Sequence, residues 1–113
     1  MEIKVFDTSK ELGKAAAVFS AQVLNRAIAE KGKARLLMST GASQFDTIEA
    51  LRDADVEWDK VEMFHLDEYI GLPETHPASF RKYLKERFLS YVDIRKAHLV
   101  NPDNGVELSL IHI

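Results

Sequence analysis

The longest hydrophobic pattern in the chain has helical spacing and follows a short alternating segment. Residues 3–6 alternate between apolar and polar side chains, which predicts a short strand. Polar residues 7–9 then offer an N-cap, and Gly32 stands where a C-capping glycine ends a helix. From Glu11 onward, apolar residues recur every three or four positions, which predicts one buried helical face. This face comprises Leu12, Ala16, Phe19, Val23 and Ala27, widened by Leu24 and Ile28.

Two short apolar runs, 34–38 and 61–66, are typical of parallel strands that are buried on both faces. A second helical pattern, roughly 44–54, lies between them, and a third begins near Pro77, which is well suited to the first position of a helix. We expect the buried face of this third helix to consist of Phe80, Leu84, Phe88 and Tyr91 or Val92. We interpret His76, Pro77 and Ser79 as capping residues. Residues 97–100 predict a last strand, so the order of elements indicates an α/β fold with a parallel sheet.

Composition narrows the kinds of molecule that the chain is expected to bind. The 113 residues are 46% hydrophobic, which fits one globular domain, and 15 Lys and Arg against 18 Asp and Glu give a net charge of −3. This balance argues against nucleic acid. The sequence has no cysteine and no histidine or carboxylate pair at metal-ligand spacing, so we expect no metal site. It also has no long apolar run and no signal-peptide pattern, so we expect no membrane association and a cytoplasmic location.

The polar turn after the first predicted strand is a candidate anion site. It consists of Ser39, Thr40, Gly41, Ala42 and Ser43. Such a turn lies at the carboxyl edge of a parallel sheet, where ligands bind, and it precedes a helix whose first N–H groups attract anions. Glycine lets the backbone approach a phosphate, and the three hydroxyl groups add donors. An ordinary turn with Ser43 as N-cap explains the segment equally well. The turn matches neither common nucleotide-binding glycine motif.

A second candidate follows the second predicted strand, where His65 is followed by Leu66, Asp67 and Glu68. Strand alternation would turn His65 and Asp67 to one side and Glu68 to the other. A partly desolvated carboxylate at a strand end is suited to removing a proton next to a carbonyl group. Taken alone, however, two acidic residues more often simply open a solvated loop. We expect His65 to be packed or orienting, and we interpret the basic residues near Arg81 as a solvated helix face.

Together these segments carry a family resemblance. The string Asp67–Pro73 reads Asp-Glu-Tyr-Ile-Gly-Leu-Pro, and it is followed by His76-Pro77, Ser79 and the segment 91–94. In these residues, and in the turn at 40–43, the sequence resembles the glucosamine-6-phosphate deaminase (isomerase) family over about residues 1–104. Related 6-phosphogluconolactonases typically have arginine at the position of Tyr69, so Tyr69 favours the deaminases. Many members of the family have Thr-Gly-Gly-Thr where this chain has Thr-Gly-Ala-Ser.

The resemblance implies a fold, a reaction and a site. The implied fold is a three-layer αβα, Rossmann-like parallel sheet. The implied reaction opens glucosamine 6-phosphate, isomerises it and releases ammonia to give fructose 6-phosphate, without a cofactor. Asp67 would be the base that moves the proton between C2 and C1. Residues 39–43, Glu68 and Tyr69 would bind the sugar phosphate, and the full-length protein would allow a homo-oligomer.

Length sets this chain apart from the family. Members run to roughly twice this size, and their second half holds the ring-opening Asp-x-His, a relay glutamate and basic phosphate ligands. We therefore interpret residues 1–107 as the N-terminal half of such a domain. Residues 108–113 do not continue the family pattern and resemble a translated sequencing adapter, so we expect a non-native tail there. We expect the 113-residue chain to be poorly folded and inactive, because half a sheet exposes its edges and one apolar face.

Two alternative functions remain open at this stage. A 6-phosphogluconolactonase-type hydrolase would open a lactone and ignore amino sugars. A regulatory domain would keep the phosphate turn without catalysis.

Overall fold

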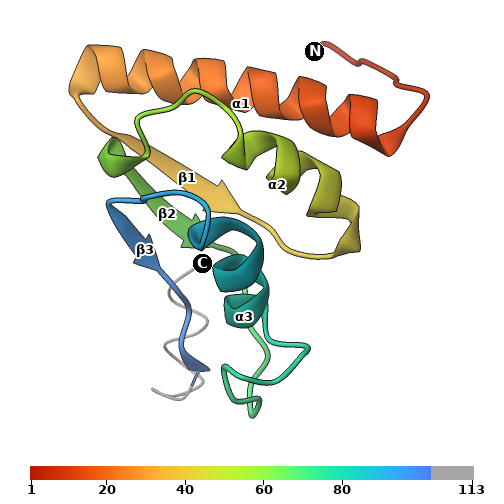
Figure 1. Cartoon of the computed structure of the whole chain (residues 1–113), viewed down its shortest axis with the longest axis vertical. Coiled ribbons are helices and arrows are strands. Elements are labelled where there is room, and N and C mark those ends of the chain that lie inside the picture. The colour runs from red at the N-terminus through yellow and green to blue at the C-terminus, as the bar shows by residue number, and fades with distance from the viewer. Residues whose placement is uncertain (103–113) are drawn as a thin grey trace.

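The computed structural model describes residues 1–102 as a three-stranded sheet with helices (Figure 1). Helix α1 (Ser9–Lys31) precedes strand β1 (Ala34–Met38), and a 3₁₀ turn η1 (Ala42–Gln44) leads into helix α2 (Phe45–Arg52). A second 3₁₀ turn η2 (Trp58–Lys60) leads into strand β2 (Val61–His65). Helix α3 (Phe80–Leu84) continues as a π-helical turn η3 (Lys85–Leu89), and strand β3 (Lys96–His98) follows. The predicted tail at 108–113 lies outside the described residues.

The sheet has the order β1-β2-β3, and both strand pairs are parallel. Ala34 is paired with Val61 and Met38 with His65, so β1 and β2 end side by side. Each connection between parallel strands contains a helix, which is the usual way for the chain to cross back to the start of the next parallel strand. The predicted α/β fold with a parallel sheet is therefore confirmed.

Helix α1 begins and ends as its sequence predicts, but only part of its predicted face is buried. The Thr8 side chain accepts a hydrogen bond from the Glu11 amide, and Gly32 ends the helix with a φ of 75°. The buried residues are Gly13, Ala17, Leu24 and Ile28. Leu24 and Ile28 are buried as predicted, but the prediction was wrong for Leu12, Phe19 and Val23, which are about half exposed or more. The small residues face α2 because they allow the two helices to approach closely. Within residues 1–102, no helix has both the length and the apolar character that a membrane crossing requires.

The predicted strand at residues 3–6 is not present in the described structure. Ile3 is 79% exposed and Val5 is 89% exposed, and neither residue pairs with a strand in residues 1–102. Figure 1 shows this segment running back past the first turns of α1. A strand is stable only when a neighbouring strand satisfies its backbone groups, and β1 pairs on its described side with β2 alone.

Helices cover only one face of the described sheet. The residues on this face, which include Ala34, Val61 and Met63, are buried together with α1, α2 and α3. The opposite face carries Leu37, which is 61% exposed, and Phe64, whose ring stacks on His98 at 4.4 Å. The prediction that β1 is buried on both faces was therefore wrong, and residues 1–102 contain two of the three expected layers. The expected uncovered apolar face is present.

The third helix begins later than predicted. Pro77 lies in a turn, and Ser79 is the N-cap, with its Oγ accepting from the Lys82 amide at 3.4 Å. Leu84 and Phe88 are fully buried, as the pattern predicts, and the Phe88 ring packs edge-on against Trp58. Tyr91 is 61% exposed and lies under the Arg52 guanidinium, so it is not part of the buried face.

We predict that Gly13→Ala destabilises the chain, although alanine favours helices by about 1 kcal/mol. A Cβ at Gly13 would lie 2.6 Å from the Asp46 carbonyl carbon of α2, so the two helices would have to separate. Overpacking of this kind costs about 1–3 kcal/mol, which exceeds the gain in propensity. Urea unfolding followed by circular dichroism measures the difference. The control is Arg26→Ala at an exposed position of α1, where little change is expected; a stabilised Gly13→Ala variant would contradict the prediction.

Candidate functional site

The two candidate loops begin at adjacent points of the sheet edge. Met38 and His65 are paired, and the Leu66 amide donates to the Met38 carbonyl at 3.2 Å, just beyond the ends of β1 and β2. Thr40 and Asp67 each lie two residues past this pair. Since neighbouring strands are about 4.8 Å apart, the loops leave the sheet side by side. This edge is where open α/β sheets bind ligands.

The first loop forms a tight turn onto the N-terminus of α2. Gly41 has a φ of 128°, a conformation that favours glycine, and η1 begins directly after it. The Gly41 carbonyl accepts hydrogen bonds from the Gln44 amide at 3.1 Å and from the Tyr83 hydroxyl at 2.7 Å. Ser39 and Ser43 are exposed. Ser43 lies within η1 and does not cap α2, so the alternative interpretation of Ser43 as N-cap was wrong.

The amide groups that open η1 and α2 give this loop a positive character. The first N–H groups of a helix lack intrahelical partners, and the aligned peptide dipoles place partial positive charge there. Neither the η1 nor the α2 N-cap residue forms a side-chain capping bond. The loop thus combines exposed hydroxyl groups with uncapped helical amides, an arrangement suited to a phosphate group.

Asp67 and Glu68 are adjacent in sequence but occupy opposite environments. Asp67 is exposed, and within residues 1–102 its carboxylate forms no hydrogen bond or ion pair. The expected partial desolvation of Asp67 is therefore not present in the described structure. The expected strand alternation also fails, because β2 ends at His65, whose ring is buried while Asp67 is exposed.

The Glu68 side chain is fully buried and holds the start of α3. Its Oε2 accepts from the Ser79 hydroxyl at 2.8 Å and from the amide and Nε of Arg81, both at 2.9 Å. Its Oε1 accepts from the Phe80 amide at 2.9 Å and the Tyr69 amide at 3.0 Å. Burial alone would raise the pKa of Glu68, but these hydrogen bonds outweigh it and lower the pKa to about 2. Because protein donors surround both oxygens, Glu68 occupies a structural position, and its predicted contact with substrate stays a prediction.

Arg81 is the buried partner of Glu68, and sequence reasoning missed it. Its guanidinium also donates to the Leu72 carbonyl at 3.3 Å and to the Asn101 side chain at 3.2 Å, and the residue is only 5% exposed. The prediction of a solvated basic face was therefore wrong for Arg81. The signal was its position, three residues before Leu84, which places it on the buried face of the helix.

His65 is packed, as predicted, and its surroundings fix its tautomer. It is 1% exposed, and its Nε2 accepts from the Val100 amide at 2.7 Å, so the neutral ring carries its proton on Nδ1. No described residue accepts a hydrogen bond from Nδ1. Burial lowers the pKa of His65; the charges of Glu68 and Asp67 oppose this effect and that of Arg81 adds to it.

Tyr69 follows Glu68 at the surface of the second loop. Half of the residue is exposed, and its ring lies against Phe80 with centroids 4.9 Å apart. The exposed ring is available to contact a ligand near Asp67. Within residues 1–102, no group of three or more histidine and carboxylate side chains is arranged to hold a metal ion.

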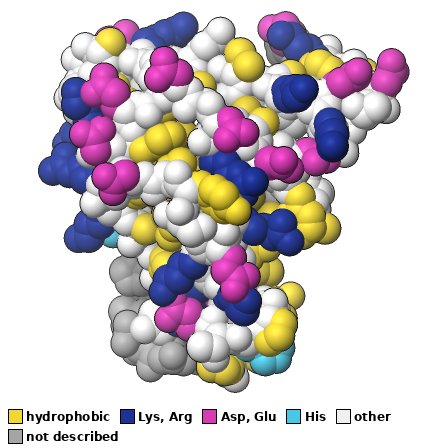
Figure 2. Space-filling view, in the orientation of Figure 1, with side chains coloured by type: hydrophobic (Ala, Val, Ile, Leu, Met, Phe, Trp, Pro, Cys, Tyr) yellow, Lys and Arg dark blue, Asp and Glu magenta, His cyan; other side chains and the backbone are white. Residues whose placement is uncertain are grey.

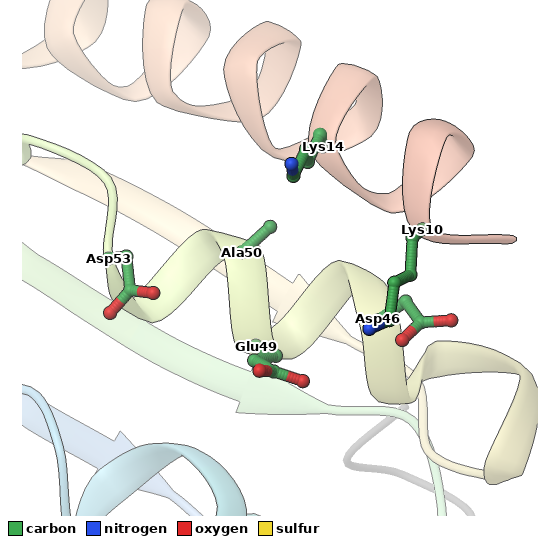
Figure 3. A pocket seen from close by; sticks show the side chains of 6 residues that line it. All are labelled: Lys10, Lys14, Asp46, Glu49, Ala50 and Asp53. Atoms are coloured by element: carbon green, nitrogen blue, oxygen red, sulfur yellow. The ribbon is translucent and has the colours of Figure 1, made fainter.

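A hollow lies between α1 and α2 (Figure 3). It has a volume of about 190 Å³ and is lined by Lys10, Lys14, Asp46, Glu49, Ala50 and Asp53. Charges of both signs line it, and Figure 2 shows acidic and basic side chains interspersed over this face of the molecule. The sheet edge therefore remains the better candidate, because it combines an anion-attracting loop with a free carboxylate.

Comparisons with known proteins agree with this fold. Residues 7–109 match the family described as glucosamine-6-phosphate isomerases/6-phosphogluconolactonase. A glucosamine-6-phosphate deaminase of Shewanella woodyi is 30% identical over 95% of this chain and 40% of its own length. That of Cellvibrio japonicus is 36% identical over 80% of this chain and 37% of its own length.

Solved structures show the same similarity. A protein named as a 6-phosphogluconolactonase from Neisseria gonorrhoeae has a TM-score of 0.76 and 28% identity, over 96% of this chain and 51% of its own. A monomeric glucosamine-6-phosphate deaminase has a TM-score of 0.82 and 24% identity, over 96% of this chain and 46% of its own. The chain belongs to the glucosamine-6-phosphate isomerase/6-phosphogluconolactonase family, and it spans about two fifths to one half of the length of these relatives.

We predict that Glu68→Gln strongly destabilises the fold at neutral pH. The change leaves the buried Arg81 guanidinium without a charged partner, which costs about 3 kcal/mol or more. Urea unfolding at pH 7 measures the loss. The matched control is Glu86→Gln, which removes the exposed ion pair with Lys82 and should cost at most about 1 kcal/mol. Equal effects of the two substitutions would contradict the buried role of Glu68.

The pH dependence of the folding stability follows from the carboxylate of Glu68. Glu68 has a pKa of about 2 in the folded chain and an ordinary pKa of 4.5. Its carboxylate therefore stabilises the fold fully above about pH 4.5. This contribution, about 3 kcal/mol, is lost as the pH falls from 4.5 towards 2. We therefore expect the difference in unfolding free energy between wild type and Glu68→Gln to shrink below pH 4.5. A difference that stays constant down to pH 2.5 would show that Glu68 is not ionised in the folded state.

We predict that His65 stays neutral, with its proton on Nδ1, to below pH 6.5 in the folded chain. Its folded pKa is lowered, so it contributes stability above its ordinary pKa of 6.5, and this stability is lost as the pH falls through the folded value. Nitrogen-15 NMR of the imidazole ring measures tautomer and titration, with His65→Gln to assign the signals. Titration at or above pH 6.5, or a proton on Nε2, would contradict the prediction.

Proposed function

We propose that this chain forms the phosphate-binding and proton-transfer part of a glucosamine-6-phosphate deaminase. In this proposal the loop at 39–43 binds the phosphate or neighbouring sugar oxygens, and Tyr69 lines the same site. Asp67 moves the proton between C2 and C1 of the open-chain sugar while the aldose becomes a ketose. Water then replaces the nitrogen at C2, so that ammonia leaves and fructose 6-phosphate is the product.

The observation that carries the proposal is the position of Asp67 beside the first loop. Thr40 and Asp67 lie at equivalent positions past paired strand ends, and Asp67 has a carboxylate that no described residue engages. A general base must be free to take a proton, and a phosphate anchored nearby would hold the sugar carbons within reach. The neighbouring Glu68 is held by five protein donors, which leaves Asp67 as the reactive acid of the pair.

A second candidate function is lactone hydrolysis. The similarity to the Neisseria gonorrhoeae protein, at 28% identity over 96% of this chain, favours it. The same edge would then bind 6-phosphogluconolactone, and Asp67 would assist attack by water. Tyr69 stands where these hydrolases typically have arginine, which favours the deaminase.

We predict that Asp67→Asn lowers the rate of ammonia release from glucosamine 6-phosphate by about 100-fold or more, with substrate binding preserved. Asparagine keeps the size of the side chain but cannot accept the proton. The assay uses both the 113-residue chain and any longer reading frame found by sequencing the source DNA beyond codon 107. The matched control is Asp93→Asn, which changes an exposed aspartate outside the two loops.

The outcomes separate the candidate functions. Ammonia release that Asp67→Asn abolishes supports the deaminase. Hydrolysis of 6-phosphogluconolactone without ammonia release supports the lactonase. Binding of glucosamine 6-phosphate with no turnover of either substrate supports a sugar-phosphate sensor. Turnover that is unchanged in Asp67→Asn overturns the role of Asp67.

A further inference from the structure

A tyrosine from α3 reaches across to the candidate phosphate loop. The Tyr83 hydroxyl donates to the Gly41 carbonyl at 2.7 Å, although the residues are 42 positions apart. Tyr83 is partly buried, and burial raises the pKa of its phenol while the Arg87 guanidinium opposes the shift. The hydroxyl therefore keeps its proton at neutral pH and acts as a donor. Tyr83 is not among the motif residues that carry the family resemblance.

The hydrogen bond fixes the orientation of the peptide group between Gly41 and Ala42. The Gly41 carbonyl also accepts from the Gln44 amide at 3.1 Å, so two donors engage it. The peptide is trans, because the described chain contains no cis bond. In a trans peptide the N–H points opposite to the C=O. The carbonyl faces Tyr83, so the Ala42 amide faces away from it.

The Tyr83 ring holds the other end of the same turn. It stacks on Phe45, the residue that follows η1, with ring centroids 5.6 Å apart. The Arg87 guanidinium covers the Phe45 ring at 3.7 Å and lies 5.4 Å from the Tyr83 ring. Tyr83 thus contacts both residues that flank η1, Gly41 through its hydroxyl and Phe45 through its ring.

We propose that Tyr83 is a positioning residue that presets the turn at 41–45 for the phosphate group of a sugar-phosphate ligand. The inference rests on the proposed function. A loop whose amides are already oriented loses less conformational entropy when an anion binds. Without the hydroxyl, the Gly41 carbonyl keeps only the Gln44 amide as a donor, so the peptide rotates more easily and the Ala42 amide points at the anion for less of the time. The effect falls on ligand affinity and leaves proton transfer by Asp67 unaffected.

The test compares Tyr83→Phe with Tyr91→Phe. Both variants lose one phenolic oxygen, but Tyr91 is 61% exposed and contacts Arg52 through its ring. Calorimetric titration with inorganic phosphate and with glucosamine 6-phosphate measures affinity on both forms of the protein, the 113-residue chain and any longer reading frame. We expect Tyr83→Phe to weaken both ligands by about 10-fold, as loss of one hydrogen bond implies, and Tyr91→Phe to leave them unchanged.

Two further measurements separate positioning from general destabilisation. In Tyr83→Phe, hydrogen exchange of the Gln44 amide, which donates to the Gly41 carbonyl, should become faster, while amides of β2 exchange as in wild type. Where turnover is measurable, KM for glucosamine 6-phosphate should rise about 10-fold with kcat unchanged. Equal loss of protection throughout the sheet, or a fall in kcat alone, would overturn the positioning role.

The inference and the proposed function fail in different ways. If wild type binds both ligands and Tyr83→Phe binds them equally well, the positioning role is overturned and the phosphate loop stands. An equal loss in Tyr91→Phe likewise overturns only the positioning role. If wild type binds neither ligand in either form of the chain, the phosphate loop itself is overturned, and the inference falls with it.

Discussion

The described structure depends on one buried carboxylate, that of Glu68. Five donors converge on it: the hydroxyl of Ser79, the amides of Tyr69, Phe80 and Arg81, and the Arg81 guanidinium. These contacts join the loop that leaves β2 to the first turn of α3, and Arg81 extends them to Leu72 and Asn101. A buried charge is tolerated only when it is paired and fully hydrogen-bonded. The loop therefore has one arrangement that satisfies Glu68, and α3 begins where that arrangement requires.

The contrast between Glu68 and Asp67 gives the two acids different chemistry. Hydrogen bonds hold the pKa of Glu68 at about 2, so it remains ionised and cannot exchange protons usefully near neutral pH. Asp67, one residue earlier, is exposed and free of protein partners in the described chain. Burying one carboxylate thus fixes the backbone that presents the other. The sequence motif contains two acids because one supports the loop and the other is left available at its surface.

Sequence patterns predicted the elements better than their packing. The strands at 34–38 and 61–66 and the caps Thr8, Gly32 and Ser79 follow from local rules of periodicity and capping. The buried face of α1 follows only at Leu24 and Ile28. Close approach at Gly13 selects small residues over the more apolar stripe at Leu12 and Phe19 in the first half of the helix. The strand at 3–6 failed because pairing depends on a distant neighbour. The loops 39–43 and 67–69 could be located from the motif, but the Glu68–Arg81 pair and the Tyr83–Gly41 contact join residues 13 and 42 positions apart.

Helix α3 connects the two halves of the candidate site. Its first turn is fixed by Glu68, next to Asp67, and one turn later Tyr83 touches both ends of the turn that follows β1. Leu84 and Phe88 are buried in one core cluster with Val61 and Met63 of β2, and this packing keeps the two contacts at a constant separation. The separation between a phosphate anchor and a proton-transferring carboxylate must match the length of the sugar between them. In this chain α3 sets the separation between the loop at 39–43 and the loop that begins at Asp67, although its own residues belong to neither loop.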